Sequence, residues 1–325
     1  VKTLNSVDFP TLGNPTIPID RDIKVNLTFF GKTVYNWNMN IGAHVSIAKG
    51  IENAPELAGE LGCEAMQIFT HSPSGGPIAE ISDETAKNFK DGVKKYGIKA
   101  VYVHAPYYIN LASKNNKIYY GSISAIRKNL ERASFLEAKY VMTHLGSSGY
   151  LAEKEMLGRL EESFAKIFDG YDGSAKLLIE NSAGAGMIIG SDFNQIGKIF
   201  KPTTVVGSQN RQRLSVLAGI CLDTQHSFAS GYDWKNSFEE NMKKIDSAVG
   251  LDKIKLMHSN DSLTDFNSHK DRHTHIGQGK IGPEGFEKLA AFAQDNDIDM
   301  ICETAYPGVV EDIKFLKEMR NSHEK

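Results

Sequence analysis

Cysteine is scarce in this sequence, and the few cysteines present are not spaced as metal ligands. Only Cys63, Cys221 and Cys302 occur among 325 residues, and no Cys-x-x-Cys appears. This argues against a disulfide framework and against a thiolate metal site. Cys221 and Cys302 lie inside short apolar runs, so we expect buried free thiols. Such thiols favour an intracellular protein in a reducing compartment, cytoplasmic or nuclear, over a secreted one.

Long hydrophobic runs are also missing. No stretch reaches the roughly 18 apolar residues that a membrane-spanning helix needs, and no basic segment followed by an apolar one marks a signal peptide. The apolar content of 41% and the charged content of 24% are those of an ordinary soluble globular protein. No Gly-x-Gly-x-x-Gly follows the first apolar run, which argues against an open doubly wound nucleotide-binding sheet.

From residue 40 onward the sequence repeats a strand-like run, a polar loop and a helical pattern. Eight apolar runs are found: Ile41–Val45, Ala65–Phe69, Ala100–Val103, Tyr140–Thr143, Lys176–Ile179, Gly219–Leu222, Ile254–Met257 and Asp299–Cys302. Helical patterns cover Asp83–Tyr96, Gly121–Glu137, Ala152–Phe168 and Val310–Met319. Eight strand–helix units over about 285 residues predict an α/β fold, a (β/α)8 TIM barrel, whose typical size is ~250 residues.

Residues 1–39 do not follow this repeating pattern of strands and helices. The alternating run Ile23–Phe29 predicts one short strand or an extended arm. The segment is too short to build a core of its own. We therefore expect an N-terminal extension over 1–39 and a barrel domain over 40–325.

Six of the eight runs end on, or just before, a histidine or a carboxylate. These residues are His104, His144, Glu180, Asp223, His258 and Glu303. A TIM barrel gathers the carboxyl ends of its strands at one mouth, so the six side chains are expected to converge. Imidazole nitrogens mixed with carboxylate oxygens, without thiolates, suit Zn²⁺, Mn²⁺ or Fe²⁺. The sequence therefore predicts a metal centre at the mouth.

Three further ligand-type residues follow the strand ends. His226 lies three residues after Asp223, and Asp271 and His273 lie two apart in the loop after the seventh run. Nine ligands exceed the three or four that one catalytic zinc needs, so two or three ions are expected. Glu180 stands in the middle of the ligand order and can bridge two of them.

Three other polar residues near strand ends are expected to play supporting parts. His44 ends the first run, and we expect a packed, hydrogen-bonded ring there rather than a ligand. Asn181 and Asn260 follow candidate ligands, and side chains in such places commonly orient the ligands themselves.

Several ordered motifs carry a resemblance to a known family. They are Ile41-Gly-Ala-His-Val-Ser46, Leu178-Ile-Glu-Asn-Ser-Ala-Gly184, Cys221-Leu-Asp-Thr-Gln-His226 with Ser227–Asp233, Met257-His-Ser-Asn-Asp261, Asp271-Arg-His273 with Gly277–Gly282, and Cys302-Glu-Thr304. Over residues 41 to about 305 the chain resembles the endonuclease IV family of apurinic/apyrimidinic endonucleases.

The resemblance implies a trinuclear zinc site. The first ion would be held by His104, His144 and Glu180; the second by Glu180, Asp223, His258 and Glu303; the third by His226, Asp271 and His273. Mn²⁺ is an expected substitute at one or more positions, since it accepts the same ligands.

The implied reaction is hydrolysis of double-stranded DNA 5′ to an abasic site, a step of base excision repair. It leaves a 3′-hydroxyl and a 5′-deoxyribose phosphate. Metal ions activate a water and neutralise the phosphodiester. Glu180 is expected to hold the two metal ions that activate the attacking water. Glu303 is expected to share a proton with this bound water. We expect a monomer acting on DNA and no membrane partner.

DNA contacts are expected from loops at the barrel mouth. Tyr107 matches a wedge tyrosine of the family, and Tyr108 can extend the wedge. The loop at 70–77 lacks the family's arginine, which leaves His71 as its cationic candidate. Arg272 and Lys280 are candidates for contacts with the DNA backbone.

The formal charge of −3 argues weakly against a nucleic-acid partner. Three divalent ions would add six positive charges and bring the chain to about +3, so much of the charge that attracts phosphate is expected to come from metal.

Two other functions compete with this interpretation. A sugar isomerase of the same barrel superfamily also places Glu, Asp and His at strand ends, usually around two ions. His226, Asp271 and His273 argue against it, because an isomerase needs no third ion. A non-enzymatic protein that binds DNA ends or damage is the second alternative, but such a binder gains little from nine intact ligands.

Overall fold

The computed structural model describes residues 27–29, 32–34, 39–76, 78–201 and 215–322. The chain divides into two compact units, residues 1–37 and 38–325. Within the first unit, β1 (Leu27–Phe29) and β2 (Lys32–Val34) pair antiparallel, with Leu27 opposite Val34. The strand expected over Ile23–Phe29 is thus present at its end, and residues 23–26 lie outside the described residues.

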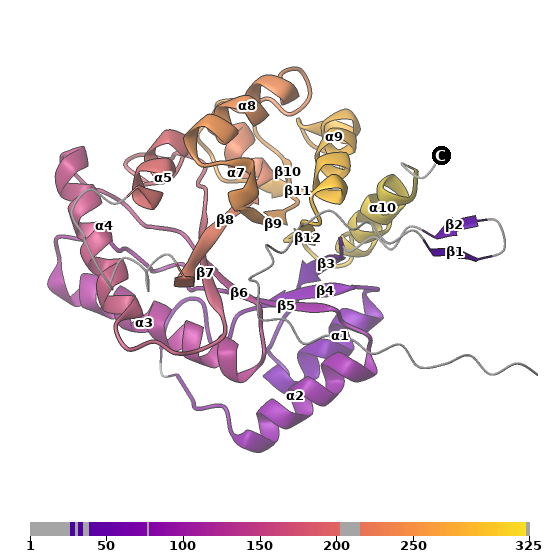
Figure 1. The fold of residues 1–325 in the computed structure, drawn as a ribbon, viewed down its shortest axis with the longest axis horizontal. Coiled ribbons are helices and arrows are strands. Elements are labelled where there is room, and N and C mark those ends of the chain that lie inside the picture. Colours follow the sequence, from indigo (N-terminus) through magenta and orange to yellow (C-terminus); the bar gives the residue numbers. More distant parts are fainter. Residues whose placement is uncertain (1–26, 30–31, 35–38, 77, 202–214, 323–325) are drawn as a thin grey trace, which may run out of the picture. The chain divides into compact units, whose positions relative to one another are not determined.

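The second unit is built on a closed, fully parallel barrel of eight strands (Figure 1). The strands are β3 (Ile41–His44), β4 (Ala65–Ile68), β5 (Ala100–His104), β6 (Tyr140–Thr143), β7 (Lys176–Glu180), β8 (Leu217–Asp223), β9 (Ile254–His258) and β12 (Asp299–Cys302). Each strand pairs with its neighbour in the chain, and β12 pairs with β3 to close the ring. All eight predicted strands and the predicted TIM barrel are confirmed.

Helices surround the barrel (Figure 1). They are α1 (Ala54–Glu60), α2 (Asp83–Lys95), α3 (Asn116–Phe135), α4 (Glu153–Phe168), α5 (Phe193–Phe200), α7 (Thr224–Ala229), α8 (Phe238–Ala248), α9 (Gly282–Asp295) and α10 (Val309–Ser322), with 3-10 turns η1 (Ile51–Asn53) and η2 (Leu251–Lys253). The predicted helices are confirmed, with shifted ends. Helix α3 begins five residues early because the Asn115 side chain accepts hydrogen bonds from the backbone N–H groups of Lys117 and Ile118.

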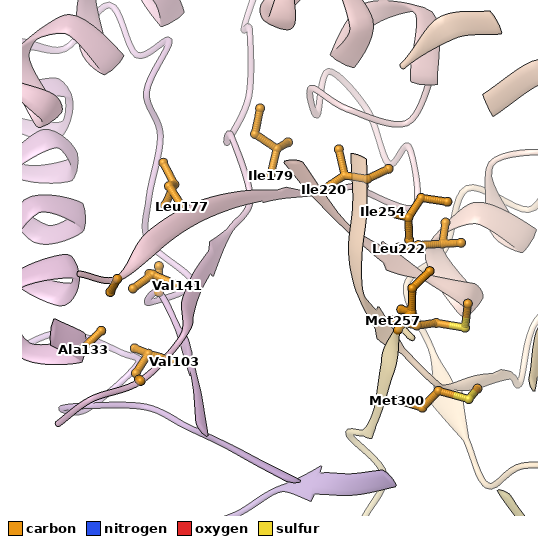
Figure 2. Close-up of a cluster of buried hydrophobic side chains, with 14 of the residues drawn as sticks. Val103, Ala133, Val141, Leu177, Ile179, Ile220, Leu222, Ile254, Met257 and Met300 are labelled. Carbon is orange, nitrogen blue, oxygen red and sulfur yellow. The ribbon is translucent and has the colours of Figure 1, made fainter. Parts of the chain in front are cut away.

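The strands are buried on both faces, as their continuous apolar runs predict. Inside the barrel lies a layer of seven residues: Ala65, Tyr102, Met142, Leu178, Cys221, Leu256 and Ile301. Figure 2 shows part of the other layer, where side chains such as Leu177, Ile220 and Met300 belong to the larger cluster of buried hydrophobic residues. All three cysteines are buried and free, as predicted. Within the described ranges no helix is long and apolar enough to cross a membrane.

A small hairpin at the mouth presents part of the site. Strands β10 (Asp261–Ser262) and β11 (His273–Thr274) pair antiparallel after β9. The buried Asp261 carboxylate accepts hydrogen bonds from the backbone N–H groups of Gly277, Gly279 and Ile281. This carboxylate therefore ties the loop that follows β11 to the strand that follows β9.

Candidate metal centre

The structure brings all nine predicted ligands together at the carboxyl ends of the strands. His104, Glu180, Asp223 and His258 are the last residues of β5, β7, β8 and β9, and His144 and Glu303 follow β6 and β12 directly. His226 lies in α7, and His273 opens β11 after Asp271. Seven of the nine line one cavity of about 530 Å³, together with His44 and Tyr107: His104, His144, Glu180, His226, Asp271, His273 and Glu303.

Glu180 lies at the centre of this cluster and is 1% exposed. Its Oε2 is 3.0 Å from His104 Nε2 and 3.5 Å from His144 Nε2. Its Oε1 is 3.0 Å from His258 Nδ1 and 3.4 Å from His226 Nδ1. The two oxygens of one carboxylate therefore face different histidines, which is the arrangement that a bridging ligand needs.

A second group surrounds His258. The ligand atoms of Glu180, Asp223, His258 and Glu303 all lie within 4.8 Å of one another. His258 Nδ1 is 3.4 Å from Glu303 Oε2 and 4.0 Å from Asp223 Oδ2. Three buried or nearly buried carboxylates around one imidazole nitrogen form a donor set that suits a divalent cation.

The third group lies on the open side of the cavity. Asp271 reaches His226 Nε2 through Oδ2 and His273 Nε2 through Oδ1, both at 3.3 Å. The Asp271 side chain is 58% exposed. His273 Nε2 is buried, and no hydrogen bond to it is found within the described part of the chain. A cation between Asp271 and the two rings would satisfy this nitrogen, so the residues fit a metal ion here.

Backbone carbonyls define which nitrogen of two histidines faces the cluster. His104 Nδ1 is 2.6 Å from the Ala105 carbonyl, and His226 Nδ1 is 3.1 Å from the Asn181 carbonyl. A carbonyl can only accept, so Nδ1 is the donor in both rings. In the neutral rings Nε2 then carries the lone pair, and it faces Glu180 in one case and Asp271 in the other.

The two asparagines contact candidate ligands, as expected. Asn181 accepts from the backbone N–H of Asp223 at 2.7 Å and donates to its carbonyl at 3.1 Å. Asn260 Nδ2 donates to Asp223 Oδ2 at 2.7 Å and to Glu303 Oε2 at 3.2 Å. Asn260 therefore helps to fix the directions in which both carboxylates point, and Asn181 holds the backbone of Asp223.

Sequence reasoning missed one residue of this site, Gln67 in β4. Its side chain is fully buried and forms hydrogen bonds with His258, Glu303 and His44. A neutral amide is not a ligand type, so a search for histidines and carboxylates passes over it. The available signal is a polar residue inside the buried strand Ala65–Ile68, where every position is buried. The bond from Gln67 also agrees with the hydrogen-bonded role expected for His44.

Charge is concentrated in this cluster. Burial raises the pKa of Glu303, but His258 and other imidazoles outweigh it and bring the value to about 2. The same balance, with His226 as the main partner, brings the pKa of Asp271 to about 2. Burial lowers the pKa of His226 and of His104, yet neighbouring carboxylates raise both above 6.5. The carboxylates therefore favour the protonated forms of His226 and His104, whereas burial lowers the pKa of His144 and of His44.

This balance predicts how the metal-free protein responds to pH. A histidine whose pKa is raised on folding stabilises the fold below its ordinary pKa of 6.5, and the contribution is lost as the pH rises through the raised value. In the presence of a chelator, the free energy of unfolding should fall above pH 6.5 by an amount on the order of 1 kcal/mol. Urea unfolding at a series of pH values from about 7 upward measures this fall, because His44 and His144, whose pKa values are lowered by burial, change their contribution below that range.

Zinc-loaded protein is the control for this measurement. Metal binding requires neutral imidazoles, so the loaded form should gain stability over the same interval. An unfolding midpoint that rises with pH in chelator would contradict the proposed pairing of the histidines.

The candidate DNA contacts occupy different surroundings. Tyr107 is 68% exposed at the cavity rim, with its ring centroid 5.3 Å from that of Phe69 and 6.0 Å from that of His104. Tyr108 beside it is partly exposed. Arg272 is exposed and donates to the Asp271 carbonyl, and the exposed Lys280 lies 3.5 Å from Asp265.

The structure does not support His71 as a cationic contact with DNA. The residue is 9% exposed. Nδ1 donates to the Ser72 carbonyl at 3.0 Å, and Nε2 lies 3.3 Å from the Asn129 side-chain amide, which donates to it. Burial lowers the pKa of His71, and the nearby Arg132 lowers it further. Both ring nitrogens are therefore occupied by the protein, because the loop that carries His71 packs against α3.

Comparison with known proteins agrees with this geometry. Residues 55–319 match the family described as xylose isomerase-like TIM barrel. The chain is 34% identical to a probable endonuclease 4 of Halothermothrix orenii over 285 residues, covering 87% of this chain and 99% of that protein. It is 36% identical to a probable endonuclease 4 of Cenarchaeum symbiosum over 290 residues, with the same coverage.

Two solved structures extend the comparison. Endonuclease IV from Thermus thermophilus matches with a TM-score of 0.75 and 29% identity, over 87% of this chain and 99% of that chain. A D-tagatose 3-epimerase-like protein matches with a TM-score of 0.64 and 21% identity, over 88% of this chain and all of that one, which shows a shared fold alone. The ligand cluster, the barrel and the relatives together lead to one conclusion: the chain belongs to the endonuclease IV family of nucleases, within the xylose isomerase-like TIM barrels.

Proposed function

We propose that this protein hydrolyses the phosphodiester bond 5′ to abasic sites in double-stranded DNA, leaving a 3′-hydroxyl and a 5′-deoxyribose phosphate. The observation that carries the proposal is the buried Glu180 carboxylate, whose two oxygens face separate groups of candidate ligands at the barrel mouth. The relatives named endonuclease 4 support the reaction class.

The ligand groups suit three zinc ions, with Mn²⁺ as a substitute. His104, His144 and Glu180 would hold the first; Glu180, Asp223, His258 and Glu303 the second; His226, Asp271 and His273 the third. When bound, such ions lower the pKa of water and neutralise the phosphate and the leaving oxygen.

Residues of the chain position the ligand groups and the carboxylate that take part in the reaction. Glu180 keeps the first two groups adjacent, because one side chain contributes to both. Glu303 lines the cavity and is held by Asn260 and Gln67. We propose that its carboxylate shares a proton with the attacking water.

Loops around the cavity are proposed to bind the DNA. An abasic site leaves a gap in the base stack, and the extrusion of a nucleotide costs a few kcal/mol. The exposed ring of Tyr107, with Tyr108 beside it, is available to fill that gap. Arg272, which adjoins the third ligand group, and the exposed Lys280 can contact phosphates.

The third ligand group favours a nuclease over a sugar isomerase or epimerase. His226, Asp271 and His273 add ligands beyond those that two ions need. Phosphodiester cleavage develops charge on a leaving oxygen that a further cation can stabilise, whereas sugar isomerisation expels no leaving group. The monomeric state and the intracellular location stay predictions.

The proposed function predicts a specific incision. Zinc-loaded protein should cut a duplex that carries one tetrahydrofuran abasic analogue on the 5′ side of the lesion, and should leave the same duplex with an intact base uncut. Denaturing gels give the position of the cut, and elemental analysis should find about three ions per chain.

Two outcomes would contradict this proposal. Tight binding of the lesion duplex without incision would indicate a damage-binding protein. Two ions per chain with turnover of a ketose would indicate an isomerase or epimerase.

A further inference from the structure

The second strand of the barrel places a neutral amide among the candidate ligands. Gln67 Nε2 is 2.7 Å from Glu303 Oε1 and 3.0 Å from His44 Nδ1. Gln67 Oε1 is 2.7 Å from His258 Nε2. The amide is fully buried, so no solvent competes for these three hydrogen bonds.

The direction of each hydrogen bond follows from elementary chemistry. A carboxylate only accepts, so the end of the amide that faces Glu303 must be the NH₂ group. The opposite end is then the carbonyl oxygen, and His258 Nε2 must carry a hydrogen to donate to it. In the neutral His258 ring, the lone pair is therefore on Nδ1.

That lone pair faces the ligand group. His258 Nδ1 is 3.0 Å from Glu180 Oε1 and 3.4 Å from Glu303 Oε2. A ring with the other tautomer would turn an N–H toward these oxygens and could not bind a cation there. The orientation of the amide thus decides whether the nitrogen is available as a ligand.

We propose that Gln67 is a positioning residue that sets the tautomer of His258 and the direction of Glu303, so that Glu180, Asp223, His258 and Glu303 are preorganised for one divalent cation. This inference rests on the metal centre proposed above, and it assigns the role of orienting ligands to β4, a strand that supplies no ligand itself.

A comparison within the site shows why a side chain is needed here. His104 and His226 donate through Nδ1 to backbone carbonyls, which no substitution removes. For His258 the acceptor is the Gln67 side chain, so this ligand depends on one replaceable residue. The same amide donates to His44 Nδ1, which leaves the His44 hydrogen on Nε2 of a ring that lines the cavity.

The test replaces Gln67 with methionine, which has a similar length and makes none of these hydrogen bonds. Zinc affinity is measured by competition with a chromophoric chelator. We expect Gln67→Met to bind one ion about 10- to 100-fold more weakly than the unaltered protein, while the remaining ions keep their affinity.

Gln294→Met is the matched control. Gln294 is a buried glutamine in α9, and neither of its polar side-chain atoms has a hydrogen-bond partner within the described residues. The same chemical change there should leave zinc affinity intact. If Gln67→Met binds every ion as tightly as this control does, the proposal is wrong.

A measurement on the unaltered protein covers the case in which Gln67→Met does not fold. Nitrogen-15 NMR of the zinc-loaded protein reports which ring nitrogen of His258 carries hydrogen. Hydrogen on Nε2 is expected, and hydrogen on Nδ1 would overturn the proposal. Both readouts concern metal and tautomer, so a failure to incise DNA would count against the proposed function and not against this inference.

Discussion

Glu180→Ala should reduce incision by several orders of magnitude while the barrel remains folded. Glu180 faces four imidazoles through two oxygens, so its loss removes a ligand from two groups at once. Without this carboxylate the first two proposed ions would lose a common ligand, and the activation of water and phosphodiester that such ions supply would be lost with them. Single-turnover incision of an abasic-analogue duplex measures the effect.

The isosteric Glu180→Gln separates charge from shape. Glutamine preserves the side-chain volume, so the fold should be kept, yet it removes the negative charge and should lose nearly as much activity. Glu155→Ala, an exposed change in α4, should incise like the unaltered protein. Incision by Glu180→Ala at the unaltered rate would show that the assignment of the metal ligands is wrong.

Gly42→Ala should prevent the barrel from folding. A Cβ atom at position 42 would lie 1.6 Å from the Ala65 carbonyl oxygen, far inside any real contact. These two residues are paired between β3 and β4, so neither backbone can move without breaking the closed ring. We expect destabilisation of more than ~4 kcal/mol, seen as insoluble protein or as a lost thermal transition.

Gly158→Ala provides the comparison. Gly158 lies within α4, and a Cβ atom there meets nothing within 4 Å. Alanine is the better helix former, so this variant should be more stable by about 0.5–1 kcal/mol. A Gly42→Ala protein with a melting temperature close to that of Gly158→Ala would contradict the register between β3 and β4.

The strand ends were predictable because barrel topology follows chain order. Each strand pairs with its neighbours in the sequence. The repeating pattern of apolar runs therefore already implies that the carboxyl ends of the strands lie together at the barrel mouth. Ligand chemistry also depends on residue type alone, which is why His104 and Glu180 were identified although 76 residues separate them. The free cysteines and the hydrogen-bonded role of His44 follow from the same local reasoning.

The contacts of Gln67 and the burial of His71 could not be predicted in this way. Gln67 contacts Glu303 across 236 residues, where β4 and β12 are separated in the ring by β3. The residue type and loop position of His71 suggest a cationic contact. In the structure, Asn129 of α3 donates to its Nε2, and the residue is buried. In neither case does the surrounding sequence reveal the partner.

The order of the elements, the barrel and the nine ligand-type side chains were thus readable from the linear pattern of residues. The closed ring was needed to show which oxygen of Glu180 faces which histidine, which nitrogen of each ring is available, and which amide holds His258. The physical reason is that apolar periodicity and ligand type can be recognised from the residues along the chain. The partner of each hydrogen bond depends on atoms about 3 Å apart, and these lie on strands that only the closed barrel brings together.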